Sequence, residues 1–246
     1  MIRMKFDISK IEFSKRDREK GIILPSHLTE ELAEDIGIHT GDGSLYLCNK
    51  WKTCREFCYS FNAKEKDYLK YVSNYKKNLY NIPKVRLYSK AGEIGFKFNS
   101  LAITNFYKIY FNIPIGKKTN ISAPNIIKKC NDVRIISGYL RGVIDTDFSL
   151  ILRKKCNKLY PSFEGTFSGI KLVNSLSKLF DKLKIKNNLL QYNVYDKRTG
   201  KTYLSNQIIL SGRERVNKVL KLIKPANDKY SEKIRLMGPE GFEPLT

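Results

Sequence analysis

The chain contains two similar segments, and this internal repeat restricts the possible folds more than any other feature. The first reads LAEDIGIHTGDGS over residues 32–44, and the second reads YLRGVIDTDFS over residues 139–149. Each has the pattern of a helix with small residues four positions apart, and each ends in Asp-x-Ser. Asp42 and Asp147, the aspartates of these endings, lie 105 residues apart. The spacing predicts two related structural units in one chain.

The same order of elements is predicted after each repeated segment: two strands, a helix, two strands and a helix. For the first unit we expect a motif helix starting near Thr29, strands over 44–49 and 54–61, a helix over 64–80, strands over 84–90 and 93–99, and a helix over 100–111. For the second unit we expect helices over 133–146, 169–184 and 213–223, and strands over 149–155, 160–167, 188–196 and 202–210.

These elements divide the chain into five parts. We expect a charged N-terminal extension over residues 1–26, a first half-domain over 27–118, a linker over 119–132, a second half-domain over 133–224, and a loosely held tail over 225–246.

The charge of the chain favours nucleic acid as its partner. There are 46 Lys and Arg against 24 Asp and Glu, a net charge of +22, and a polyanion is the natural partner of such a chain. A membrane surface is the weaker alternative, because no long basic amphipathic helix is visible. Only two histidines occur, His27 and His39, which argues against histidine metal sites and Ser-His-Asp hydrolysis and leaves the chemistry to carboxylates and lysines.

The sequence also indicates where the chain works. No apolar run approaches the roughly 20 residues that span a bilayer, and the charged N-terminus does not have the pattern of a signal peptide. The five cysteines are an odd number without metal-type spacing, as expected for a reduced, intracellular protein. Zinc bound by Cys48, Cys54 and Cys58 is the alternative, but packing explains these residues better because a fourth ligand is missing.

Small residues in the two motif helices predict that the helices pack closely. Gly37 and Gly41 lie one turn apart, as do Gly138, Gly142 and Thr146, which removes side-chain bulk from one stripe of each helix. Such packing would bring Asp42 and Asp147 together at the negative ends of their helices, where they repel each other. Mg²⁺ suits two carboxylates next to phosphate, and phosphodiester hydrolysis requires this equipment. The alternative is that both aspartates merely terminate helices.

The two motifs carry a family resemblance. Residues 35–43, DIGIHTGDG, and 140–148, LRGVIDTDF, resemble the paired signature motifs of LAGLIDADG homing endonucleases, and Asn112–Lys118 is similar to the segment that closes the first half in single-chain, archaeal-type members. The resemblance implies an α+β fold with two pseudo-symmetric αββαββα half-domains, whose motif helices pack at the centre and whose antiparallel sheets form a saddle over double-stranded DNA. It further implies a monomeric, Mg²⁺-dependent enzyme of a mobile element that cuts both strands.

The resemblance also assigns roles to residues. Asp42 and Asp147 would bind the metal, with the carbonyl groups of Gly41 and Thr146 beside them. A basic or polar residue on a central strand would assist the attacking water. Lys97 matches this place in the first half, and Gln207 or Ile209 matches it in the second half, so that one lysine is missing.

Basic and polar residues on the strands are the candidates for DNA contacts. The candidates are Lys84, Arg86, Tyr88, Lys90 and Asn99 in the first half, and Arg153, Lys154, Lys155, Lys197, Arg198 and Lys201 in the second half. Alternation predicts that the first-half candidates share one face of the first sheet, opposite Val85 and Leu87. An ordinary solvated sheet face is the alternative.

One residue departs from the motif, because Phe148 stands where the family has Gly. A glycine just after a helix is commonly left-handed, and a bulky residue forced there would cost about 1–2 kcal/mol. We therefore expect a displaced Asp147, and activity that is equal or higher after Phe148→Gly. Together with the missing lysine, Phe148 favours an alternative function, a cleavage-deficient protein of the same fold that acts as a maturase on intron RNA or as a DNA-binding regulator.

Overall fold

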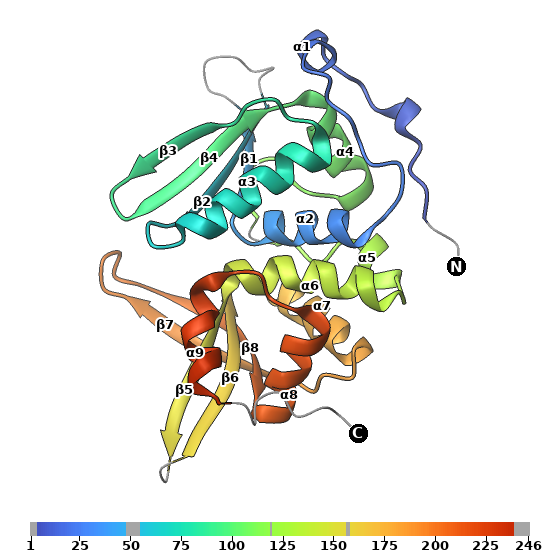
Figure 1. Cartoon of the computed structure of the whole chain (residues 1–246). Coiled ribbons are helices and arrows are strands. Elements are labelled where there is room, and N and C mark those ends of the chain that lie inside the picture. The colour runs from blue at the N-terminus through green and yellow to red at the C-terminus, as the bar shows by residue number, and fades with distance from the viewer. Residues whose placement is uncertain (1–3, 48–54, 119, 156–157, 239–246) are drawn as a thin grey trace.

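Each half of the molecule is built on a four-stranded antiparallel sheet, and the two halves meet along a pair of helices (Figure 1). The computed structural model describes residues 4–47, 55–118, 120–155 and 158–238. The α+β class and the repeated order of elements are confirmed. The first half contains α2 (Glu30–Thr40), β1 (Gly43–Leu47), β2 (Arg55–Asn62), α3 (Lys66–Tyr80), β3 (Arg86–Lys90), β4 (Glu93–Asn99) and α4 (Leu101–Phe111).

The second half repeats this topology. It contains α6 (Val133–Asp147), β5 (Phe148–Lys155), β6 (Lys158–Phe167), α7 (Ile170–Lys182), β7 (Asn188–Asp196), β8 (Lys201–Ser211) and α8 (Arg213–Lys218), which continues as a π-helical turn over Val219–Ile223. The strand orders, β1-β2-β4-β3 and β5-β6-β8-β7, correspond position by position.

The motif helices α2 and α6 lie side by side across the centre of the molecule (Figure 1). Glycine is required where they touch. A Cβ atom on Gly37 would lie 2.2 Å from the carbonyl oxygen of Tyr139, and one on Gly142 would lie 2.3 Å from that of Glu34. The predicted close packing of the two small-residue stripes is therefore confirmed.

Strand alternation gives each sheet one buried face and one face that we call the open face. In the first half, Phe96 and Phe98 of β4 are buried, whereas Lys97 between them lies on the open face. In the second half, Ile208 and Leu210 of β8 are buried, and Ile209 lies on the open face. The open face of each sheet is the surface that the predicted saddle would present to DNA.

The N-terminal residues are part of the first half and not a separate extension. This segment contains a 3₁₀ turn (Ile8–Lys10) and helix α1 (Lys15–Glu19), and its Phe6 and Ile22 side chains are buried in the core. The Asp17 carboxylate accepts hydrogen bonds from the backbone N–H groups of Leu101 (3.2 Å) and Ala102 (3.1 Å). It therefore caps the start of α4.

The expectation of a loosely held tail is wrong for residues 225–238. A 3₁₀ turn (Asp228–Tyr230) and helix α9 (Ser231–Leu236) pack against the second half. The buried Tyr230 hydroxyl donates to the carbonyl groups of Ile144 (2.5 Å) and Phe148 (2.9 Å). Hydrophobic periodicity missed this segment because polar contacts hold much of it in place. The rest of the expected tail lies outside the described residues, as do Cys48, Cys54 and Cys156.

The expectation of strain at Phe148 is also wrong. Its φ of −101° and ψ of 155° are those of an extended strand residue, because β5 begins directly after α6. The ring is buried and lies edge-on to Phe167 and Phe180. Phe148 is therefore a core residue, and Phe148→Gly would remove packing without relieving any strain.

The expected linker holds helix α5 (Asn125–Lys129). Within the part of the chain that the structure describes, no helix combines the length and apolar character that crossing a bilayer requires.

Candidate functional site

The two motif aspartates meet at the C-terminal ends of α2 and α6. A Cβ atom on Gly41 would lie 2.6 Å from Oδ2 of Asp147 across the seam between the helices, so no larger residue fits there. Burial and the neighbouring Asp147 carboxylate raise the pKa of Asp42 to about 7. Burial likewise raises the pKa of Asp147, against the lowering effect of Lys118 and Lys229. The site therefore holds two crowded carboxylates that a cation would stabilise.

Lys118 places an ammonium group at the end of α2. Its Nζ donates to the carbonyl oxygens of His39 (3.0 Å), Thr40 (2.8 Å) and Gly41 (2.6 Å). These are groups that a helix end leaves without intrahelical partners. Burial lowers the pKa of Lys118 to about 8, although Asp147 and Asp42 favour its charged form.

Lys229 places an ammonium group at the end of α6. Its Nζ donates to the carbonyl oxygens of Asp145 (2.7 Å) and Thr146 (3.3 Å). The Asp145 carboxylate in turn accepts hydrogen bonds from the backbone N–H groups of Ala226 (2.9 Å) and Asn227 (3.2 Å), which fixes the segment that carries the lysine. Each helix end thus has its own lysine, and both lysines act electrostatically on both aspartates.

The surroundings of the two lysines differ. Glu65, just before α3, lies 3.7 Å from Nζ of Lys229 and accepts a hydrogen bond of 2.7 Å from Nδ2 of Asn227. Lys118 instead borders a cavity of about 220 Å³, together with Gly41 and Asp147. The lining of this cavity is completed by Thr40, Ile121, Thr166, Phe167, Ser168, Gly169 and Leu172.

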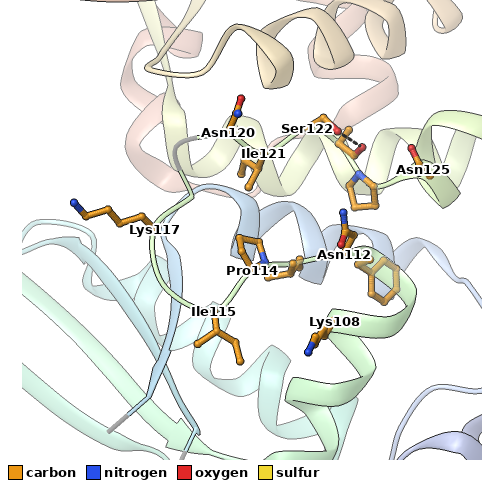
Figure 2. A pocket seen from close by; sticks show the side chains of 13 residues that line it. Lys108, Asn112, Pro114, Ile115, Lys117, Asn120, Ile121, Ser122 and Asn125 are labelled. Atoms are coloured by element: carbon orange, nitrogen blue, oxygen red, sulfur yellow. Dashed lines mark hydrogen bonds between the residues drawn. The ribbon is translucent and has the colours of Figure 1, made fainter. Parts of the chain in front are cut away.

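A larger cavity, of about 520 Å³, lies along the connection between the halves (Figure 2). Its lining includes Lys108 at the end of α4, Asn112 and Pro114 after it, and Asn125 at the start of α5. Asp42 and Asp147 do not line this cavity, so it is not part of the candidate site.

The donor set suits a divalent cation that arrives with a phosphate. Among the described residues no cluster of three or more His, Cys, Asp or Glu could hold a metal. Mg²⁺, however, is often bound by one or two carboxylates with water and substrate phosphate, and Asp42 and Asp147 supply two. The Gly41 and Thr146 carbonyl groups, predicted as further ligands, already accept hydrogen bonds from the two lysines, and each retains a second lone pair.

Lys97 interacts with other residues of the open face. A hydrogen bond with Tyr46 and the carboxylate of Glu56, 3.4 Å away, raise its pKa. Lys118 and Lys229 act electrostatically on Asp42 and Asp147.

Strand register corrects the predicted partner of Lys97. In the first half Ser44 pairs with Cys58, and Cys58 pairs with Lys97. In the second half Ser149 pairs with Glu164, and Glu164 pairs with Ile209. Ile209, and not Gln207, therefore occupies the place of Lys97. Gln207 Nε2 donates to Glu164 (3.2 Å).

The candidate DNA contacts of the first half lie largely as predicted. Arg86, Tyr88 and Lys90 belong to β3 and share the open face with Lys97 and Asn99 of β4. Arg86 forms an ion pair with Glu56 and also donates to Oδ1 of Asn99 (3.0 Å). Lys84 is exposed but precedes the strand.

In the second half, Arg153 lies on the open face and forms an ion pair with Glu164. Lys154 follows Arg153 in β5 and points to the opposite face, because successive side chains of a strand alternate. Lys155 belongs to β5, and its side chain lies outside the described part of the structure. The exposed Lys197, Arg198 and Lys201 lie at the β7–β8 turn.

Sequence reasoning missed Lys118 and Lys229 as site residues. Lys118 ends the Asn112–Lys118 segment, and Lys229 follows the last helix of the second half, so both lysines come after the closing helix of their half. This shared position is the signal that could have found them, but the two lysines do not follow their motif aspartates at the same interval.

Comparison with known proteins supports the fold. No family model matches the sequence, and no curated protein sequence matches it. A structure from work on mesophilic variants of the homing endonuclease I-DmoI matches with a TM-score of 0.53 and 14% identity over 79% of this chain and 95% of that chain. I-DmoI in complex with DNA and Mn matches with a TM-score of 0.53 and 14% identity over 80% and 98%.

The LAGLIDADG homing endonuclease I-GzeII, in complex with its DNA target, matches with a TM-score of 0.51 and 13% identity over 87% of this chain and 94% of that chain. The chain thus has the fold of the LAGLIDADG homing endonucleases, confirmed at low sequence identity over most of its length.

Proposed function

We propose that this chain is a site-specific, metal-dependent DNA endonuclease that makes a double-strand break. The observation that carries this proposal is the convergence of Asp42 and Asp147, each at a helix end that also holds a lysine. The net charge of +22 suits a polyanionic substrate. The fold matches proteins solved with DNA, Mn and Ca.

In this proposal the open faces of both sheets lie against duplex DNA, with the motif helices between them. Asp42 and Asp147 lie between the scissile phosphates of the two strands and hold the divalent cation. A bound Mg²⁺ would supply a Lewis acid and lower the pKa of a coordinated water. Because the two aspartates belong to different halves, both halves are needed for the double-strand break.

Lys118 and Lys229 supply positive charge beside the two aspartates. Each ammonium group is half-buried at a helix end, where it offsets the negative charge of the carbonyl groups and of the aspartates. When a phosphate enters, the positive charge of the same ammonium group would stabilise the charge that develops on a phosphoryl oxygen, and Lys118 would exchange one of its three carbonyl partners to donate to it. These two lysines are therefore further candidates, beside Lys97, for assisting the reaction.

The cleavage-deficient alternative loses one of its two supports. The strain expected at Phe148 is absent, because its backbone is extended. The second support remains, because Ile209 occupies the place of Lys97 in the second half, although Lys118 and Lys229 bring positive charge to the two aspartates.

The experiment is incubation of the purified protein with a plasmid carrying its uninterrupted host locus, with and without Mg²⁺. We expect a linear product only with Mg²⁺. Asp42→Asn and Asp147→Asn should each abolish it, and Lys118→Met should slow it by about 10²–10³-fold, the typical cost of losing one stabilising donor.

Exposed neighbours give the matched controls. Asp67→Asn in the first turn of α3 and Lys117→Met beside Lys118 change the same charges on exposed side chains, and both variants should cut like the wild type. Tight binding of the plasmid without cutting in any divalent metal would contradict the proposal and favour a binding-only protein.

A further inference from the structure

The open face of the β7–β8 hairpin carries a group of exposed apolar and aromatic side chains, beside the polar Asn188, Ser205 and Gln207. Leu190 and Tyr203 are 50% and 51% exposed, and Tyr192 is 42% exposed. Val194 and Ile209 are half-buried beside them. Large apolar side chains grouped on a surface commonly mark an interaction site.

Strand register places these residues on one face. Leu190 pairs with Gln207, Tyr192 with Ser205, and Val194 with Tyr203. The apolar residues of this group therefore lie on the same face of the sheet as Ile209, which pairs with Asn188. Ile208 and Leu210 point into the core. The apolar group is therefore continuous with the open face of the second sheet, next to Arg153 and Glu164.

The corresponding hairpin of the first half is charged. On its open face Arg86 pairs with Lys97, and Lys90 pairs with Glu93, with Asn99 at the end of β4. Two hairpins at equivalent places in the fold thus present different chemistry, hydrogen-bonding groups in the first half and apolar groups in the second.

Two observations indicate that duplex DNA covers this apolar face. The face continues the surface that the proposed function places on DNA. Its outer end carries three exposed basic residues, Lys197, Arg198 and Lys201, and Asp196, which ends β7, pairs with Arg198 (3.4 Å). This charge suits phosphates at the rim of an apolar contact.

Base edges in the major groove include one apolar group, the methyl group of thymine. A two-stranded β-ribbon fits into that groove, and apolar side chains contact this methyl. Arg and Lys instead pair with guanine, and Asn pairs with adenine. The two hairpins therefore match different base edges.

We propose that the β7–β8 open face recognises thymine methyl groups, so that the DNA half-site read by the second half of the protein is rich in thymine. The half-site read by the first half contains guanine contacts of Arg86 and Lys97. This inference rests on the proposed function, because it assigns base preferences to the same DNA surface.

The test begins with selection of bound duplexes from a library randomised over about 20 base pairs, roughly two helical turns. We expect one half of the selected site to be enriched in thymine. Selection with Arg86→Ala identifies the half-site of the first sheet, because its preferences relax there. Thymines of either half-site are then replaced by deoxyuridine, which removes the methyl group and keeps the pairing edge.

Wild-type affinity should fall about fourfold for each contacted methyl lost from the second half-site, the equivalent of about 0.8 kcal/mol for one buried carbon. The same replacement in the first half-site should change affinity by less than about twofold. Leu190→Ser should remove most of the uracil effect. Leu204→Ser is the matched control, because Leu204 is also 50% exposed but lies on the opposite face of the same hairpin, and it should behave like the wild type.

Each other result has a distinct meaning. Equal uracil effects in both half-sites, or none in either, would overturn this inference while leaving DNA cleavage in place. A loss with Leu204→Ser as large as with Leu190→Ser would overturn it as well. If no duplex is selected, or if single-stranded RNA is bound in preference, the proposed function fails and this inference fails with it.

Discussion

The cores of the two halves differ although the halves share one topology. Behind the first sheet, the fully enclosed Lys76 ammonium lies 2.5 Å from Oδ1 of Asp35, and the hydroxyl groups of Tyr80 and Tyr107 donate to the same carboxylate. The residue of α6 that corresponds to Asp35 is Leu140, which is also fully buried but lies in an apolar core.

This difference shows which features the fold requires. The shared topology goes with the small-residue stripes of α2 and α6 and with strand alternation, both of which are common to the two halves. The chemistry behind the sheets varies, because a buried ion pair and well-packed apolar residues can fill similar volumes at comparable net free energy. The comparison can be tested by making the halves more alike.

Phe148→Gly, which gives the second motif the glycine of the first, should produce the largest effect. Loss of the buried ring costs about 3–5 kcal/mol, and glycine in a strand adds about 0.5–1 kcal/mol. We expect a marked fall in the free energy of unfolding, measured by urea denaturation. In the first half, a Cβ atom on Gly43 would lie 2.4 Å from Nδ1 of His39, so the two positions are not interchangeable. Unchanged stability would show that Phe148 does not support the core.

Lys76→Met should be nearly as damaging. It leaves Asp35 charged in a dry core, and breaking a buried pair costs about 3–5 kcal/mol. The double variant Asp35→Leu/Lys76→Met imitates the second half and should recover most of the loss in the same denaturation experiment. A double variant as unstable as the single one would show that the first half depends on its ionic core.

His39 should give the first half a pH dependence that Ile144, its counterpart in α6, cannot give. Burial lowers the pKa of His39 well below its ordinary value of 6.5, and Lys118 and Lys76 lower it further. Below pH 6.5 the unfolded chain therefore binds a proton that the folded chain does not, so this contribution to stability is present above pH 6.5 and falls as the pH drops.

The slope should approach 1.4 kcal/mol per pH unit below that pH. The measurement is the difference in unfolding free energy between the wild type and His39→Ile from pH 7.5 to 5, because other titrating groups cancel in it. A difference that does not change with pH would contradict the assignment.

The two site lysines provide the smallest expected difference. Lys229 is paired with Glu65, whereas Lys118 borders the cavity of about 220 Å³. Glu65→Gln should change the nicking rate of one strand by about two- to fivefold, because a part-exposed ion pair contributes about 0.2–1 kcal/mol. Strand-specific labels on the duplex separate the two rates. Asp67→Asn is the control, and equal changes in both strands would show that the centres are not separately supported.

The sequence predicted features that depend on local pattern. Alternation placed Phe96 in the core and Lys97 on the open face, and glycine spacing placed α2 against α6. It could not predict features that arise when distant segments meet. Lys118, Lys229 and Tyr230 gain their roles only where they touch the ends of the motif helices, and Asp17 gains its role by capping a helix far along the chain. The error at Phe148 came from a rule for helix ends followed by a turn, whereas here a strand follows at once.

The C-terminal segment also has a consequence for synthesis of the protein. Lys118 is made before α6, but Lys229 leaves the ribosome after every strand of both sheets. We therefore expect the second helix-end lysine to reach its place only after the strands of both sheets have been made, held there by the carbonyl group of Asp145. Until then a nascent chain has both sheets but only one of the two helix-end lysines, and under the proposed function this order of assembly would delay cleavage.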